Sequence, residues 1–248
     1  MTCKYKLIIE YIGTYYSGWQ KQPNKPTIQE ETEKALSKIF RSKIIVIGSG
    51  RTDAGVHAVG QTAHITLPKP KKELSHLQLR NSLNALLPKD ITIRALDPIT
   101  DDFHARFSAK GKIYRYYITK RKKPSPFLEP FRHAISYPLD LKAMQNAASF
   151  LIGEHDFASF SNSGRTYKTT VRNINKLEIQ EQDEDVIFEF SGNGFLYKMV
   201  RNITGTLIEI GKHKMKPKQI RDIMNTGNRI HAAETAPAKG LFLHQVLY

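Results

Sequence analysis

One acidic side chain stands in a glycine-rich stretch of the sequence, where it could do chemistry. The segment Gly48–Ala58 reads GSGRTDAGVHA, and it holds a single carboxylate, Asp53, two residues after Arg51. An ionised carboxylate can act as a nucleophile or a general base, and a nearby positive charge favours the ionised form. The alternative is a structural aspartate that caps its own turn by bonding to the backbone, the commoner role in loops.

The flanking elements are expected to position this stretch. The apolar run Ile44–Ile47 precedes it and the alternating segment Gln61–Leu67 follows it, which predicts a loop between two strands. Upstream, a strand is expected over Tyr5–Tyr11, and Thr27 and Glu30 have the spacing of a capping box before a helix. Loops held by rigid strands are common places for catalytic groups.

The remaining elements follow in an order that repeats. The sequence predicts helices over Ser75–Leu87, Asp140–Gly153 and Leu196–Ile210 and a short helix from Pro217, with strands over Ile91–Leu96, Ile113–Thr119, Val171–Ile179, Val186–Phe190 and Leu241–Tyr248.

A weak internal repeat supports two similar halves facing each other across a groove. The motif SGRT occurs at Ser49–Thr52 and at Ser163–Thr166, and the helix starts near Thr27 and Leu141 lie equally far upstream of it. Tyr167 stands in the second copy where the first has an acid, so one copy alone supplies a carboxylate.

The charge balance favours a polyanionic partner. The chain carries 38 Lys and Arg against 23 Asp and Glu, a net charge of +15 with a pI near 9.8, and cations that neutralise phosphates release condensed counterions. A generally basic surface is the alternative. The segment Lys120–Pro126, interpreted as the connection between halves, is either solvated or in contact with phosphate.

Several other classes lack their sequence signals. No apolar run is long enough to span a bilayer, and the single cysteine, Cys3, excludes an internal disulfide and fits a reducing cytoplasm. Metal chemistry is weakly supported, because no His-x-x-x-His pair occurs among the histidines. A glycosidase would need a second carboxylate flanking the bond, and no comparable one stands out.

Aromatic residues alternate with cations in two further segments, Phe103–Phe107 (FHARF) and Tyr114–Tyr117 (YRYY). On a strand, Tyr114 and Tyr116 share one face, so core packing is expected for Tyr116. Tyr114 is either a core residue as well or a platform on which an unstacked base lies. Arg201 follows an apolar helix face and is either a solvated flank or a buried partner of an anion.

Taken together, these motifs resemble the TruA-type tRNA pseudouridine synthases over essentially the whole chain. The matching segments are Gly18–Gln20 (GWQ), Gly50–His57 (GRTDAGVH), Asp102–Ala109 (DFHARFSA), Tyr114–Tyr116 (YRY), Phe195–Asn202 (FLYKMVRN) and Ala236–Leu241 (APAKGL).

The resemblance implies an enzyme that isomerises uridine to pseudouridine in the anticodon stem-loop of tRNA, without a cofactor or metal. It implies that Asp53 is the catalytic nucleophile, although attack at C1′, attack at C6 and removal of a sugar proton all stay open. It further implies that Tyr114 stacks on the target base, Arg51 assists flipping, Arg201 pairs with the Asp53 carboxylate and Leu241 forms part of an apolar wall.

The implied fold is α+β, with two similar halves related by a pseudo-twofold axis. They share a continuous, mostly antiparallel sheet with helices on one side and a basic central cleft, the first half spanning 1–110 and the second 111–248. A homodimer is implied as well. RNA contacts are expected at Phe103, His104, Ala105, Arg106, Phe107, Ser163, Gly164 and Arg165. A noncatalytic RNA-binding or tRNA-chaperone protein on the same scaffold is the alternative function.

Overall fold

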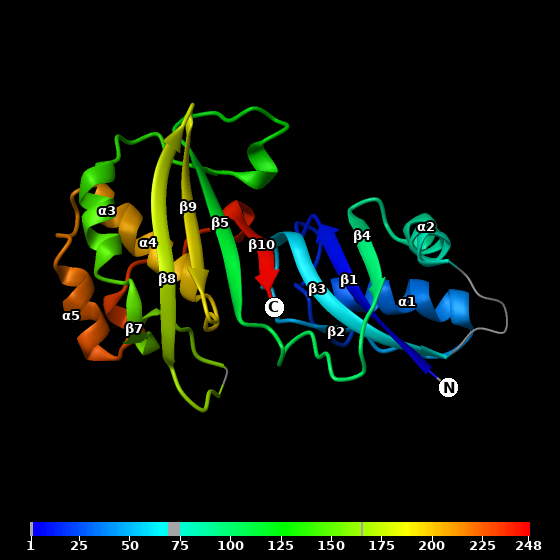
Figure 1. The fold of residues 1–248 in the computed structure, drawn as a ribbon. Coiled ribbons are helices and arrows are strands. Elements are labelled where there is room, and N and C mark those ends of the chain that lie inside the picture. The colour runs from blue at the N-terminus through cyan, green and yellow to red at the C-terminus, as the bar shows by residue number, and fades with distance from the viewer. Residues whose placement is uncertain (1, 69–74, 165) are drawn as a thin grey trace. The chain divides into compact units, whose positions relative to one another are not determined.

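The computed structural model describes residues 2–68, 75–164 and 166–248, and the chain divides into two compact units (Figure 1). Unit 1 comprises Met1–Lys110 and Phe242–Tyr248, and unit 2 comprises Gly111–Leu241. Helices accompany mostly antiparallel strands in both units, which confirms the expected α+β class. None of the described helices is long and apolar enough to cross a membrane.

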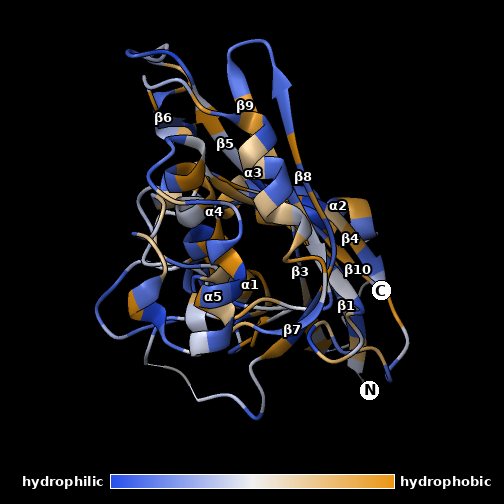
Figure 2. Cartoon of the chain, turned by 90° about the vertical axis from the view of Figure 1, so that its left-hand side faces the viewer, coloured by the Kyte–Doolittle hydropathy of each residue, from blue (hydrophilic) through white to orange (hydrophobic). Residues whose placement is uncertain are grey.

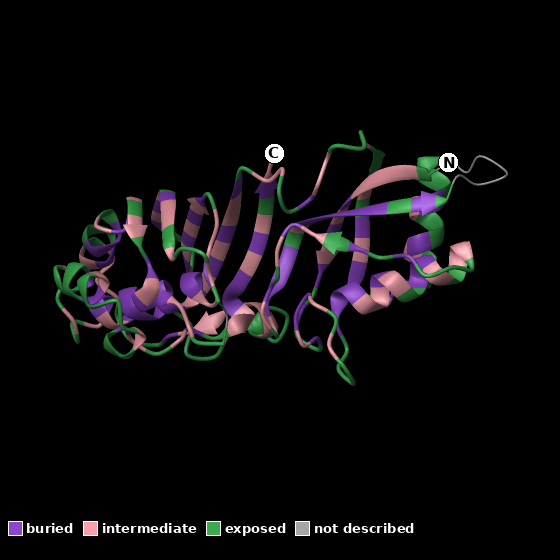
Figure 3. Ribbon diagram, turned by 90° about the horizontal axis from the view of Figure 1, so that it is seen from below, coloured by how far each residue is buried: buried purple, intermediate pink, exposed green. Residues whose placement is uncertain are grey.

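In unit 1, the strands pair in the order β4, β1, β3 and β10, and β2 pairs with β3. The bounds are β1 Thr2–Tyr11, β2 Ile47–Gly48, β3 His57–Pro68, β4 Ile91–Pro98, β10 Leu241–Leu247, α1 Ile28–Phe40 and α2 His76–Leu86. Side chains alternate along β1, so that Leu7, Ile9 and Tyr11 are buried. Buried Leu36 of α1 and Leu83 of α2 belong to the core of the same unit, with the helices on one face of the strands (Figure 3).

The C-terminal strand differs from the sequence-based division, which assigned all of 111–248 to the second half. β10 lies parallel to β3, with Phe242 opposite His57 and Leu243 opposite Ala58. The rings of Phe242 and His57 stack with centroids 4.6 Å apart. Strand pairing therefore makes Phe242–Tyr248 part of unit 1.

In unit 2, the strands pair in the order β5, β9, β8 and β7, and β6 pairs with β5. The bounds are β5 Gly111–Thr119, β6 His133–Ala134, β7 Gly153–Asp156, β8 Val171–Gln182, β9 Asp185–Gly192, α3 Leu141–Ser149, α4 Met199–Gly211 and α5 Gln219–Thr226. Single 3-10 turns occupy Glu129–Phe131, Ala158–Phe160, Arg229–His231 and Ala238–Gly240. The almost wholly buried α4 supplies the core, whereas the β8–β9 hairpin ends in hydrophilic residues (Figure 2).

Three local expectations were wrong. The segment Lys120–Pro126 lies inside unit 2, between β5 and the turn at Glu129–Phe131, and does not connect the two units. The helix from Asp140 ends at Ser149, and Gly153, with φ 102°, begins β7 instead. Residues 44–46 are not part of a strand, because side chains of α1 bond both backbone groups of Val46.

Candidate active site

Asp53 lies in the loop between β2 and β3, on a turn that fixes its backbone. The amide of Val56 donates to the Asp53 carbonyl at 3.1 Å, and Gly55 has a φ of 75°, a conformation that suits glycine at the third turn position. The Asp53 side chain is half-buried, whereas Arg51 is exposed. The loop therefore presents the carboxylate from an ordered backbone.

The segment Gly13–Trp19 packs against this loop and holds it through backbone hydrogen bonds. The amide of Trp19 donates to the carbonyl of Thr52 at 3.2 Å, and the amide of Gly55 donates to the carbonyl of Tyr16 at 3.3 Å. At Gly18, with φ 95°, a Cβ atom would lie only 2.5 Å from the Thr52 carbonyl oxygen. The close approach of the two backbones requires glycine there.

A buried hydroxyl pair anchors the residue before Asp53. The Tyr11 hydroxyl and Thr52 Oγ1 lie 2.8 Å apart, and both side chains are buried. Burial raises the pKa of Tyr11 well above its usual value, so this hydroxyl stays protonated. The pair ties the loop to the last residue of β1.

The start of the loop is held by the neighbouring strand. The amide of Ser49 donates to the carbonyl of Thr62 at 2.7 Å, and its hydroxyl donates to Gln61 Oε1 at 2.9 Å. The Gln61 amide in turn donates to the carbonyl of Gly50 at 3.0 Å. All of these anchors of the loop come from unit 1.

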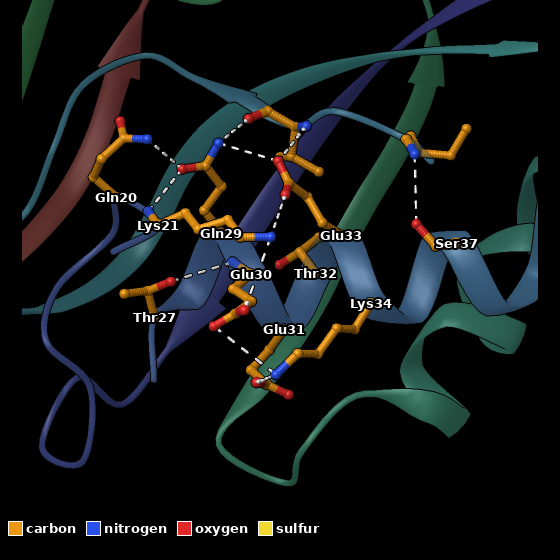
Figure 4. Close-up of polar contacts among 12 residues, drawn as sticks. Gln20, Lys21, Thr27, Gln29, Glu30, Glu31, Thr32, Glu33, Lys34 and Ser37 are labelled. Atoms are coloured by element: carbon orange, nitrogen blue, oxygen red, sulfur yellow. Dashed lines mark hydrogen bonds and ion pairs between the residues drawn. The ribbon is translucent and has the colours of Figure 1, made fainter. Parts of the chain in front are cut away.

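A polar network on α1 holds the chain as it enters β2 (Figure 4). The nearly buried amide of Gln29 donates to the Val46 carbonyl at 3.0 Å and to Glu33 Oε1 at 3.1 Å. Glu33 accepts from the Val46 amide at 3.1 Å, and Gln29 Oε1 accepts from Gln20 and from the Lys21 amide. The role of Gln29 was not predicted from the sequence, although a polar residue on the apolar face of a helix could have indicated it.

We expect Gln29→Leu to lower the free energy of unfolding by about 1 to 3 kcal/mol, because it leaves the buried Val46 carbonyl without its partner. Urea unfolding at neutral pH measures the change. Thr32→Val is the matched control in the same helix, since the buried Thr32 hydroxyl donates to the Ile28 carbonyl of its own helix. An equal loss in both variants would contradict the role given to Gln29.

In unit 2, Tyr114 lies on β5 with 7% of its surface exposed, and its ring meets Phe195 edge-to-face at 5.3 Å. Tyr116 on the same face is fully buried, as expected of a core residue. The two tyrosines thus share a face on which both are buried, Tyr114 slightly less completely than Tyr116.

The segment after residue 231 contacts the predicted site residue Arg201 and the core residue Tyr116, and it leads into the predicted site residue Leu241. Arg201 Nε donates to the Ala236 carbonyl at 2.8 Å, and the Ala236 amide donates back to the Arg201 carbonyl at 3.2 Å. The Tyr116 hydroxyl donates to the Pro237 carbonyl at 2.9 Å. The chain then turns into Leu241, which is 5% exposed. Arg201, half-buried, is therefore no freely solvated flank.

Asn202, which sequence analysis missed as a site residue, organises the surroundings of Arg201. This fully buried amide donates to the Phe160 carbonyl at 2.7 Å and to Asn162 Oδ1 at 2.8 Å. Its oxygen accepts from Thr235 at 2.7 Å and from Arg229 at 3.2 Å. Every bonding position of the amide is used, so α4 is pinned to segments on both sides.

The predicted RNA-contacting segment Phe103–Phe107 is held in unit 1 by a buried histidine. The Ala105 amide donates to His64 Nδ1 at 3.1 Å, and the His64 and His104 rings lie 4.7 Å apart. Phe107 is 76% exposed and Arg106 is exposed, with its guanidinium 5.6 Å from the Phe107 ring centroid. Ala105 is fully buried, so it anchors the segment and presents no surface.

Two of the three predicted contacts in the second SGRT copy are described, and both are exposed. Ser163 lies on the surface, and Gly164 has a φ of 93° with open space around it. Arg165 lies outside the described residues. Among residues 2–68, 75–164 and 166–248, no three His, Cys, Asp or Glu side chains gather to form a possible metal site.

We expect His64 to make the protein less stable as the pH falls. Burial, with smaller contributions from His104 and Lys4, lowers the pKa of His64 to about 4 in the folded state, against about 6.5 when unfolded. Between these values the unfolded chain binds the extra proton, so the free energy of unfolding decreases as the pH falls from about 6.5 to about 4.

The variant His64→Asn keeps an acceptor near the position of Nδ1 but cannot titrate. Its loss of stability between about pH 7 and about pH 5, measured by urea unfolding, should be smaller than that of the parent protein. His76→Asn, at an exposed site, is the control. Identical pH dependence in the parent and His64→Asn would exclude this role for His64.

Comparison with known proteins gives the same family along the whole chain. A family model described as tRNA pseudouridine synthase matches residues 7–108 and again residues 147–248. The "tRNA pseudouridine synthase A" of Chlamydia trachomatis serovar L2b is 48% identical over 100% of this chain and 93% of its own length. The protein of the same name from Acetivibrio thermocellus is 44% identical over 98% of both chains.

The double match confirms the two similar halves expected from the repeat. The α+β units and these relatives define the class of the protein, which is an isomerase. The chain belongs to the tRNA pseudouridine synthase family.

Proposed function

We propose that this protein converts uridine to pseudouridine in the anticodon stem-loop of tRNAs, with Asp53 as the catalytic nucleophile. The observation that carries the proposal is the Asp53 carboxylate, half-buried on a loop whose backbone is bonded to Tyr16 and Trp19. The strong identity to relatives named tRNA pseudouridine synthase A supports the reaction.

The reaction makes limited demands on the protein. The N1–C1′ bond breaks, the uracil turns, C5 bonds to C1′, the C5 proton leaves and N1 gains a proton. Atoms and electrons balance without an oxidant, reductant or water, and every route open to Asp53 needs its carboxylate ionised. A fixed, partly shielded carboxylate suits that task because it has little reorganisation to undergo.

The remaining residues handle the flipped nucleotide. Tyr114 stacks on the target base, Arg51 assists flipping, and Leu241 forms part of the apolar wall. Arg201 supplies positive charge to the catalytic carboxylate. Support comes from the chemistry: extruding a base costs about a few kcal/mol, and stacking on an aromatic ring returns roughly 1 to 3 kcal/mol per base.

The tRNA partner accounts for the excess of basic residues. Exposed Arg106 and Phe107, together with Ser163 and Gly164, are proposed RNA contacts, since a cation and an exposed ring suit phosphates and unpaired bases. Arg165 is also proposed as an RNA contact, because it belongs to the second SGRT motif together with Ser163 and Gly164. We further propose that the enzyme acts in the cytoplasm as a homodimer.

We expect Asp53→Asn to abolish pseudouridine formation, with a fall of at least about 1,000-fold in single-turnover rate, because the amide cannot act as a nucleophile. Unmodified tRNA transcripts are incubated with enzyme, and pseudouridine is mapped by carbodiimide treatment and primer extension. Asp97→Asn makes the same chemical change at an exposed site of unit 1 and should stay active.

Two results would overturn parts of the proposal separately. If the parent protein gives no new stop on any tRNA, the enzymatic function is wrong. If the parent gives stops and Asp53→Asn gives the same stops at the same rate, the reaction stands and the nucleophile is another group. Binding of tRNA by Asp53→Asn at parental affinity shows that only chemistry was removed.

Removing the Tyr114 ring should lower kcat/KM more than removing the Tyr114 hydroxyl alone. We expect Tyr114→Leu to lower kcat/KM by about 10- to 100-fold, the equivalent of one lost stacking contact, and Tyr114→Phe to lower it less. Tyr117→Leu, three residues further along β5, is the control because side chains an odd number of positions apart on a strand face opposite ways. Equal effects of Tyr114→Leu and Tyr117→Leu would contradict the stacking role.

A further inference from the structure

Carboxylates already neutralise many cations of unit 2. Arg115 pairs with Glu189 at 2.7 Å, Arg132 pairs with Asp185 at 2.7 Å, and Lys176 contacts Glu178 at 2.9 Å. Further pairs are Lys120 with Glu181, Arg121 with Glu184, Lys212 and Lys214 with Glu209, and Lys239 with Glu129. The number of cations in this unit therefore overstates how many of them are available to a phosphate.

The pairs at Lys120 and Arg121 bear on the segment Lys120–Pro126. Their partners lie at the end of the β8–β9 hairpin, which is hydrophilic there (Figure 2). A cation already held by a carboxylate gains less from a phosphate, because the first partner must be given up. The phosphate-contact interpretation of this segment is weakened for these two cations.

A second group of cations is held by aromatic rings instead. The Arg172 guanidinium lies 5.8 Å from the ring centroid of Tyr167, and Lys198 Nζ lies 5.3 Å from that of Tyr197. Within the part of the chain that the structure describes, neither cation forms an ion pair with a carboxylate. A ring face orients a cation without cancelling its charge.

A hydrogen bond joins the two cation–ring pairs into one cluster. The Tyr197 amide donates to the Tyr167 hydroxyl at 2.7 Å, so the two rings belong to one local arrangement. Arg172 also donates to the Thr169 carbonyl at 2.9 Å, which fixes the direction of its side chain. All four side chains of the cluster are half-buried, and they keep solvent access while being held in place.

The cluster stands in the second copy of the repeat. Tyr167 occupies the position that Asp53 occupies after the first SGRT motif, so the second copy has an aromatic ring where the first has the reactive acid. The exposed Ser163 and Gly164 lie just before it in sequence. Two oriented cations beside two rings match the chemistry of a nucleic acid strand, which offers phosphates and base faces in alternation.

We propose that Tyr167, Arg172, Tyr197 and Lys198 form a binding site for the phosphate backbone of a tRNA strand. The site rests on the proposed function, because that function makes tRNA the substrate. The second SGRT copy then serves binding, while the first serves catalysis.

The test is the salt dependence of tRNA affinity. Binding of a labelled, unmodified tRNA transcript is measured by fluorescence anisotropy over a series of KCl concentrations, for the parent and for Arg172→Gln and Lys198→Gln. Each variant should reduce the slope of log K against log[salt] by about 0.7 to 0.9, the contribution of one neutralised phosphate. The double variant should show roughly the sum.

The matched controls are Lys120→Gln and Lys176→Gln, which remove the same charge from paired cations of the same unit. Their slopes should stay at the parental value. Arg172→Lys keeps the charge and should also keep the slope, which separates loss of charge from disturbance of the fold.

Equal slopes for the cluster variants and the two controls would overturn the proposed binding site. That failure is distinct from failure of the enzymatic function, because pseudouridine formation by the parent protein is assayed on the same transcript. A parent protein that modifies the tRNA while Arg172→Gln and Lys198→Gln bind with unchanged slopes overturns the binding site alone.

Discussion

The close approach of two backbones in unit 1 is the constraint on which the loop that carries Asp53 depends. Trp19 and Tyr16 of the segment Gly13–Trp19 form backbone hydrogen bonds with the loop. A Cβ atom at Gly18 would have no room beside the Thr52 carbonyl. A loop held by backbone hydrogen bonds loses little conformational entropy when a substrate binds. The backbone that carries Asp53 is therefore held in one arrangement, which suits the proposed role of its carboxylate as the reacting group.

Buried polar side chains extend this order beyond the loop itself. In unit 1, Gln29 satisfies the backbone of Val46, and in unit 2, Asn202 joins α4 to the segments that contain Phe160 and Thr235. Such groups are costly to leave unpaired, so a fully satisfied network specifies one arrangement of the chain around it. The cations of unit 2 are also held in place, some by carboxylates, such as Arg115 and Arg132, and others by aromatic rings, such as Arg172 and Lys198.

The sequence predicted what depends on neighbours along the chain. Helix starts at Thr27 and Asp140 follow from caps that act within one turn, and both caps are present. The bonds of Gln29 and Asn202 could not be predicted, because their partners are distant in sequence. For the same reason the pairing of β10 with β3 and the neutralisation of Lys120 were missed. The loop with Asp53 was found because its residue types are themselves unusual.

The release of the C5 hydrogen tests the central claim most directly. A tRNA transcript labelled with tritium at C5 of its uridines is incubated with excess enzyme, and the tritium freed into water is counted, then repeated with label confined to the anticodon stem-loop. We predict release from both substrates, because forming the C5–C1′ bond displaces that hydrogen. Absence of release from the fully labelled tRNA would contradict the proposed isomerisation, and release from it but not from the stem-loop label would contradict the proposed position.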